Sequence, residues 1–289
     1  MTPALVEALG RIVGPRWVRH RAAERATYAA DGLPTHESLP GVVVLPGTRG
    51  EVAAVLRLLH LLGVPFVARG AGTGLSGGAL AGTDAVLITL TRLHRILAMH
   101  PGQRRAVVEP GVINTRLSEA AAPSGLQYVP DPSSQSACTI GGNVAENAGG
   151  PHCLKYGVTT NHVTALDVLR PDGQLARLGS PHGEPWGPDL VGLFVGSEGM
   201  FGVAVEITVR LEPVPRMIRT IFSDFMELRS ASEAVTAILA SGVVPVRTIG
   251  PLISVSSCRS AAEIKTGNCP HDVASMMVGH RSSFIVEGA

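Results

Sequence analysis

Two segments of the chain combine glycine with small polar residues densely enough for the backbone to lie against a ligand. The first is RGAGTGLSGGA, residues 69–79, and the second is DPSSQSACTIGGNVAENAGG, residues 131–150. Because glycine has no Cβ atom, successive N–H groups stay uncovered and can wrap an anion. In the first segment the donors of Arg69, Thr73 and Ser76 lie among five glycines. The first segment therefore predicts a binding site for a diphosphate.

The first segment also matches the Rossmann pattern G-x-G-x-x-G over residues 72–77. A Rossmann loop opens a helix that faces the pyrophosphate, but residues 79–84 lead straight into the strand-like stretch 85–90. Residues 91–99 contain no acid to hold a ribose hydroxyl, and the segment lacks the Gly-Lys-Ser/Thr triplet of a P-loop. A flexible loop without a ligand is the remaining alternative, which the interspersed donors disfavour.

The second segment has the composition that the flat ring of a flavin requires. Its donors and paired glycines are Ser133, Ser134, Thr139, Gly141, Gly142, Asn143, Asn147, Gly149 and Gly150. Such a stretch is poor core material, whereas a flavin needs flat contact from small residues and hydrogen bonds at its pyrimidine edge. Because FAD joins a flavin to a diphosphate, the two segments together predict an FAD site.

Composition excludes several other classes of partner. The 289 residues carry a formal net charge of +1, which predicts neither a nucleic acid nor an anionic membrane as partner. No apolar run approaches the roughly 20 residues of a membrane span, and the N-terminus lacks the apolar core of a secretory signal. The four cysteines form no C-x-x-C pair. We expect a protein of the reducing cytoplasm without a transmembrane segment.

A strand, helix, strand unit precedes the first segment. Residues 42–45 predict a strand, and Thr48 with Glu51 has the spacing of a capping box. The helix ends at Gly63, and a second strand follows at 64–68. One helix face carries the apolar residues Val52, Val55, Leu56 and Leu59. Such a unit normally makes a parallel pair with a right-handed crossover.

The rest of the chain continues as mixed α and β. The pattern predicts strands at 85–90 and 105–109, a short helix capped by Asn114 and running through Ala121, a hairpin of 163–170 with 174–178, and a strand at 203–211. Pro213 and Pro215 stop both helix and central strand, so we place a domain boundary near Pro215.

Beyond that boundary a second domain begins. The pattern predicts a strand at 217–222 and then a helix that ends at Gly242, with Ser230 and Glu233 in capping-box spacing at its start. From Arg247 onward the periodicity dissolves and predicts no element. The roughly 45 residues after that helix are too few for a further domain of usual size.

Four ordered motifs resemble the FAD-linked oxidase family, the vanillyl-alcohol oxidase-like flavoproteins with a PCMH-type FAD-binding domain. They are RGAGTGLSGGA, PDPSSQSACTIGGNVAENAGG, Lys155-Tyr156-Gly157 and VGSEGMFG at 195–202. The likeness is greatest to glycolate oxidase FAD subunits and D-lactate dehydrogenases and covers about residues 25–246. It implies an α+β fold. In this fold residues 1–215 form the FAD-binding domain, with two α/β subdomains at about 25–100 and 101–215, and residues 216–246 begin a cap domain.

The resemblance also implies the residues that hold FAD. Those at the diphosphate are Arg69, Gly70, Ala71, Gly72, Thr73, Gly74, Ser76, Gly77 and Gly78. Those at the flavin are Pro132, Ser133, Ser134, Thr139, Ile140, Gly141, Gly142, Asn143, Ala145, Asn147, Gly149, Gly150, Tyr156 and Gly157. Those on the nucleotide side are Glu198, Gly202 and Val203. Some family members bond FAD through a histidine where this chain has Thr73, which implies noncovalent binding.

The chain departs from the family at its C-terminal end. Relatives finish with a cap domain and a helical region, and the 2-hydroxy-acid members carry the metal motif H-x-G-D-G-N-x-H, which this chain lacks. We hypothesise that the gene is truncated or shifted in frame near Arg247, leaving an atypical tail at 247–289 that is disordered or out of frame. The tail residues Cys258, Cys269, His271 and His280 match no standard zinc spacing, so we predict no metal.

The resemblance implies an FAD-dependent oxidoreductase that oxidises a small 2-hydroxy acid by hydride transfer to flavin N5. Its partners would be that substrate and other oxidase subunits or an electron acceptor. An inactive flavin-binding module, or a subunit completed by another chain, is the alternative, and a different substrate is a third. His152 and Lys155 are candidates for substrate contact or are simply solvated, and no catalytic residue is assigned.

Overall fold

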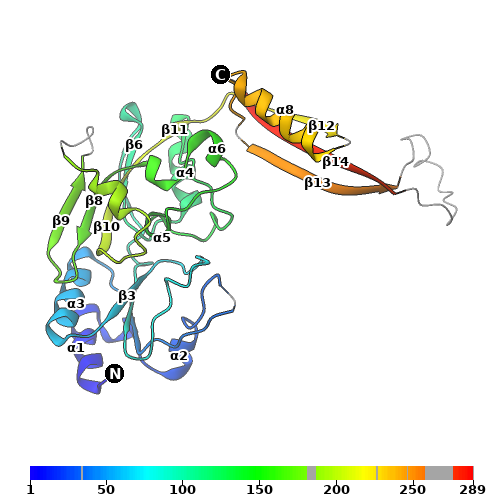
Figure 1. Ribbon diagram of the computed structural model, residues 1–289. Helices are drawn as coiled ribbons and strands as arrows, with labels where there is room; N and C mark the ends of the chain where they lie inside the picture. Colours follow the sequence, from blue (N-terminus) through cyan, green and yellow to red (C-terminus); the bar gives the residue numbers. More distant parts are fainter. Residues whose placement is uncertain (34, 181–186, 226, 246, 258–275, 289) are drawn as a thin grey trace. The chain divides into compact units, whose positions relative to one another are not determined.

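The computed structural model describes residues 1–33, 35–180, 187–225, 227–245, 247–257 and 276–288. The chain divides into two compact units (Figure 1). The first comprises Met1–Gly150 and Gly157–Val214, and the second comprises Pro151–Tyr156 and Pro215–Ala289.

The first unit begins with a four-stranded sheet of order β1-β2-β4-β3. Its strands in that order are Val18–Arg19, Val42–Val44, Val86–Thr89 and Phe66–Arg69. Strands β2 and β3 both run parallel to β4, and β1 is antiparallel to β2. The predicted strand, helix, strand unit is therefore present, but its two strands do not pair with each other because β4 lies between them.

Helix α3 (Arg49–Leu62) connects β2 to β3 and ends as the sequence predicts. The Thr48 hydroxyl accepts from the Glu51 N–H at 3.1 Å, and Gly63 is left-handed. The Glu51 carboxylate, however, accepts from the Gly47 N–H at 2.7 Å, one residue before the capping position. The four predicted apolar residues of the helix are all fully buried, and α1 (Pro3–Val13) packs beside them. A short helix, α2 (Ala22–Ala26), follows β1.

A five-stranded antiparallel sheet of order β5-β6-β10-β8-β9 forms the rest of the first unit. Its strands in that order are Ile96–His100, Arg105–Val108, Val203–Arg210, Val163–Leu169 and Leu175–Gly179. The β8–β9 hairpin confirms the turn predicted at 171–173. The chain passes from one sheet to the other between Thr89 and Ile96, a little before the predicted subdomain boundary.

Three helices pack on one face of the five-stranded sheet and share its core. They are α4 (Asn114–Ala121), α5 (Ile140–Glu146) and α7 (Leu190–Phe194). The predicted cap at Asn114 is wrong: Ile113 is the capping position, and the buried Asn114 amide instead donates to the Pro130 carbonyl at 2.8 Å. A small ribbon joins β7 (Leu126–Gln127) to β11 (Glu212–Pro213).

The second unit contains a three-stranded antiparallel sheet of order β12-β14-β13 with one helix packed on it (Figure 1). Its elements are α6 (Cys153–Tyr156), β12 (Met217–Phe225), α8 (Leu228–Ala240), β13 (Arg247–Ser257) and β14 (Met276–Gly288). The capping box predicted at Ser230 is wrong, because α8 begins at Leu228 and Ser230 lies inside it. Two strands occupy the tail for which the sequence predicts no element. Cys258, Cys269 and His271 lie outside the described residues.

Candidate functional site

The first glycine-rich segment leaves β3 as an open loop. Among the described residues, no acceptor takes a hydrogen bond from any backbone N–H between Gly70 and Ala79. The loop is also half-exposed rather than packed into a core. No helix follows it, since the chain runs on to β4, which confirms that the segment is not a Rossmann loop. A row of uncovered donors of this kind is suited to an anion.

Arg69 shapes this loop from within. Its buried guanidinium donates to the backbone carbonyls of Tyr28 at 3.3 Å, Ala30 at 2.8 Å and Ala79 at 3.4 Å. Burial lowers the pKa of Arg69, and the Asp31 carboxylate opposes that change. Gly72 has a φ of +72° and places its α-carbon against the guanidinium, where a side chain would collide. Arg69 therefore connects the two ends of the loop to each other and to the backbone of Tyr28 and Ala30.

The second segment is folded rather than open. The Thr139 hydroxyl accepts from the Gly142 N–H at 3.3 Å and begins α5, and the left-handed Asn147 ends it. The side chains of Ile140 and Val144 are fully buried in the core of the five-stranded sheet. The prediction that this segment is poor core material is therefore wrong. One face of α5 packs into the protein, and the other remains for a ligand.

The two glycine-rich segments contact each other at two places. The Gly70 α-carbon lies against the Thr139 hydroxyl so closely that a side chain at Gly70 would collide with it. Farther along, the Ser76 hydroxyl donates to the Glu146 carboxylate at 2.5 Å. A cavity of about 310 Å³ opens between the segments. Predicted site residues that line it are Arg69, Gly70, Ala71, Gly72, Thr73, Gly74, Ser76, Gly78, Pro132, Ser133, Ser134, Thr139, Gly142, Asn143, Ala145, Gly149 and Glu198.

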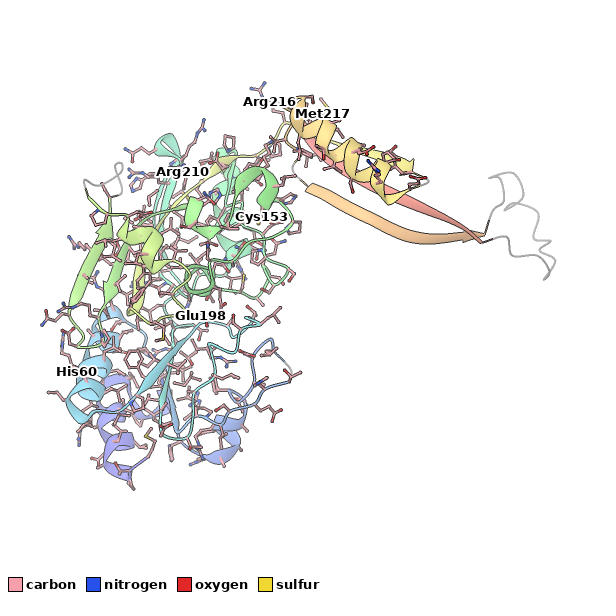
Figure 2. The ribbon with its side chains drawn as sticks, viewed as in Figure 1. His60, Cys153, Glu198, Arg210, Arg216 and Met217 are labelled. Carbon is pink, nitrogen blue, oxygen red and sulfur yellow. The ribbon has the colours of Figure 1, made fainter. Side chains whose placement is uncertain are left out.

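A smaller cavity of about 60 Å³ shares part of this lining, including Arg69, Thr139 and Glu198. It is bordered by the predicted residues Gly141, Gly202 and Val203 and by others with no glycine signal, Leu90, Pro110 and Phe194. Glu198, labelled in Figure 2, is left-handed with a φ of +51°, and its N–H donates to the Ala145 carbonyl at 2.9 Å. The loop that follows α7 therefore contributes Glu198 to the lining of both cavities.

A few predicted residues lie elsewhere. The described lining of the two cavities does not include Gly77, Ile140, Asn147, Gly150, Tyr156 or Gly157. Ile140 is core, and the Asn147 carboxamide oxygen accepts from the Thr160 N–H at 3.0 Å. Tyr156 belongs to the second unit. Their contact with a cofactor stays a prediction.

The polar groups of the larger cavity fit a dinucleotide. Among its described lining residues the charged ones are Arg69, Glu146 and Glu198. A diphosphate there would be held by N–H groups more than by cations. Asn143 is 2% exposed, and its Nδ2 is buried with no hydrogen-bond partner in the structure. A buried donor without a partner is costly, so it indicates an acceptor on a bound ligand. Loop and carboxamide together fit FAD.

Cys138 is a lining residue that the sequence analysis left without a role. Burial raises the pKa of its thiol, and the nearby polar side chains of Ser134 and Asn143 oppose that change without either making a hydrogen bond of normal geometry to it. The thiol is therefore protonated at neutral pH and is a neutral wall of the cavity. Glu146 was also missed, although it stands inside the second segment, because a carboxylate is an unexpected neighbour for a diphosphate.

Comparison with known proteins places this site in a family. Residues 40–179 match the family described as FAD binding domain, and the chain carries an FAD-binding domain of the PCMH type. The α+β fold superposes on a structure of alkyldihydroxyacetonephosphate synthase with a TM-score of 0.82 at 19% identity, covering 100% of this chain and 56% of that one. This likeness shows the fold alone.

Two curated relatives are similar in sequence. The chain is 48% identical over 228 residues to glycolate oxidase subunit GlcD of Escherichia coli strain K12, covering 79% of this chain and 46% of that protein. It is 32% identical over 247 residues to D-lactate dehydrogenase of Anaerostipes hadrus, covering 85% and 52%. The chain thus spans about half the length of these relatives. It is related to these FAD-linked oxidoreductases, as the sequence motifs predict.

No helix in the ranges given above is both long and apolar enough to cross a membrane. Within the same ranges, no three residues among His, Cys, Asp and Glu cluster as metal ligands would.

Proposed function

We propose that this chain is the FAD-binding part of an oxidoreductase that acts on a small 2-hydroxy acid. The observation that carries the proposal is the run of uncovered N–H groups at residues 70–79, in a loop whose residues other than Gly77 line the cavity beside α5. The named relatives, a glycolate oxidase subunit and a D-lactate dehydrogenase, support the substrate class. In this proposal residues 1–215 form the FAD-binding domain and residues 216–246 begin the substrate domain.

Each group of residues has a separate task in binding. The loop N–H groups hold the diphosphate, and Arg69 keeps the loop in the shape that exposes them. The Ser76 hydroxyl donates to the Glu146 carboxylate and ties the loop to α5. The Asn143 carboxamide donates to an acceptor on the flavin. Glu198 and Val203 lie on the nucleotide side. Thr73 cannot form the covalent bond that a histidine makes, so FAD is held noncovalently.

Bound FAD would supply the two-electron acceptor, taking a hydride from the substrate carbon at flavin N5. The chain's own contribution is to bind, orient and desolvate, because a cavity walled by a protonated thiol and a buried α5 face excludes water from one side of a ring. We assign no base for the hydroxyl proton. A partner oxidase subunit or the rest of a longer protein would supply it.

The alternative is a flavin-binding module without activity of its own. The part of the chain that matches the named relatives spans about half of each of them. In that case the site binds FAD in the same way, but substrate does not reduce it.

One experiment separates these functions. The purified chain is titrated with FAD and the flavin spectrum is recorded, then glycolate, D-lactate or D-2-hydroxyglutarate is added without oxygen. Bleaching of the flavin by one of these acids supports the oxidoreductase, and a bound flavin that none of them bleaches supports the module. A chain that takes up no FAD contradicts both.

A further inference from the structure

Arginines gather at one end of the five-stranded sheet, at the far end of β10 from the cavity. Arg210 ends β10 and lies directly opposite Arg105 on β6, which in turn lies opposite His100 on β5. Arg104, beside Arg105, is left-handed with a φ of +50°. We name Arg104, Arg105 and Arg210 the arginine row. Figure 2 shows Arg210 at the end of the first unit away from His60, with Glu198 between them.

The row lies on the outer face of the sheet. Ala106, Val108, Ile207 and Val209 point into the core shared with α4, α5 and α7. Because side chains alternate along a strand, Arg105 and Arg210 point to the opposite face. Arg104 and Arg210 are exposed and Arg105 is half-buried. Residues paired directly across antiparallel strands have Cβ atoms about 5 Å apart, so the two arginine side chains leave the sheet next to each other.

No acid neutralises the row. In the part of the chain that the structure describes, none of these three arginines forms an ion pair. Arg105 donates from Nη2 to the Gln103 side chain, while its Nη1 is buried without a hydrogen-bond partner. Like charges directly opposite each other destabilise a sheet, and an unpaired buried donor adds to that.

The middle of the β8–β10 pair in the same sheet shows the contrast. There the Asp167 carboxylate accepts from Arg49 at 3.0 Å and lies 3.3 Å from Arg177, and Glu206 lies 3.9 Å from Arg49. At this position of the sheet, arginines are therefore paired with carboxylates of the same chain. Among the described residues, no carboxylate serves the arginine row in this way.

We infer that the arginine row is a docking surface for a carboxylate-rich face of another protein. Planar guanidiniums bind carboxylates in a two-pronged geometry, which a side-by-side pair extends into a row. A chain with a formal net charge of +1 has no wider positive field for a nucleic acid. The choice of a protein rests on the proposed function, in which another subunit or an electron acceptor completes the activity.

The test uses the full chain and a fluorescein-labelled glutamate-rich peptide as probe, with the same peptide carrying glutamine as reference. Anisotropy is measured at low salt for the wild type, for Arg105→Gln with Arg210→Gln, and for Arg11→Gln with Arg116→Gln. The last pair is the matched control, because it removes the same charge from exposed arginines near Glu7 and Glu119. FAD binding is measured separately for each, so that failure of the proposed function is distinguishable.

We expect the glutamate peptide to bind wild type and control equally and the row variant about tenfold more weakly, a change of about 1.4 kcal/mol. We also expect the row variant to melt no lower than wild type, because a purely structural row would lose stability. Equal weakening in both variants overturns the inference. It is also overturned if a single-stranded oligonucleotide binds as tightly with the same dependence on the row, or if millimolar inorganic phosphate displaces the peptide.

Discussion

The two glycine-rich segments are alike in composition and differ in what their backbones do. The N–H groups of residues 70–79 meet no acceptor among the described residues, whereas those of Gln135, Cys138 and Gly142 are all occupied by Pro132, Ser134 and Thr139. Glycine content thus predicts that a ligand can approach the backbone of both segments closely. Hydrogen-bond pairing distinguishes the first segment, whose N–H groups remain available to a ligand, from the second, whose N–H groups named here are used within the protein. In the proposed function the first segment binds FAD through its backbone. The second is fixed in place and offers one spare side-chain donor, Asn143.

The largest expected effect is from Gly72→Ala in the open loop. Alanine is strained at a φ of +72°, and its methyl group would collide with the Arg69 guanidinium, which three carbonyls hold in place. Together these effects cost about 3 kcal/mol, so FAD affinity measured by flavin fluorescence should fall on the order of a hundredfold.

Gly102→Ala is the matched control, because nothing lies within 4 Å of the added methyl and Gly102 has no positive φ. It should leave FAD affinity unchanged. Equal affinity in Gly72→Ala and wild type would show that the shape of the loop does not matter for binding.

Asn143→Leu tests whether the Asn143 carboxamide donates a hydrogen bond to bound FAD. Removing an unpaired buried donor should leave the free energy of unfolding of the FAD-free protein the same or higher, measured in urea. The same change should weaken FAD by about 1.4 kcal/mol, close to tenfold. A variant that is less stable but binds FAD normally would make Asn143 a structural residue.

Local signals predicted much of the fold. Thr48 and Gly63 gave both ends of α3, and the turn at 171–173 gave the β8–β9 hairpin, because caps and turns depend on neighbouring residues. The insertion of β4 between β2 and β3 depends on distant pairing, which no local pattern contains. Ser230 has capping-box spacing but lies inside α8, since the same letters also fit a helix interior.

The sequence predicts the residues of the cavity lining that glycine marks, but not those that reach the cavity through packing. Residues of the first loop line the cavity as the motif implies, whereas Pro110 and Phe194 reach the smaller cavity from a turn and from α7. Ile140 stands within the motif, but the helical period turns its side chain into the core, so its predicted contact with the flavin stays a prediction. Periodicity over seven residues broken by two glycines is too short to reveal α5.

A pH titration tests how tightly the second segment is packed. Burial raises the pKa of Cys138, so the unfolded thiol ionises first as the pH rises. The stability contribution is full below the unfolded pKa and declines as the pH climbs from about 8.5 toward the folded pKa, by at most about 1.4 kcal/mol per pH unit. Urea unfolding of wild type minus Cys138→Ala should show this decline. A flat difference would mean that the thiol is solvated.

The smallest effect is expected where the two segments touch through side chains. Ser76→Ala and Glu146→Gln each alter the hydrogen bond between loop and helix, which is exposed. We expect FAD to dissociate about twofold faster in either variant, an effect on the order of 0.5 kcal/mol. A double-mutant cycle on the dissociation rate should give coupling between the two positions, and independent effects would show that the contact does not restrain the loop.

Hydrogen exchange measured by mass spectrometry, with and without FAD, tests most directly whether the backbone of residues 70–79 holds the diphosphate. We predict that FAD strongly slows exchange of the amides in this loop and changes the α5 amides of residues 142–146 less, because those are already hydrogen-bonded in the helix. FAD that binds fully while the loop amides exchange as fast as before would contradict the account.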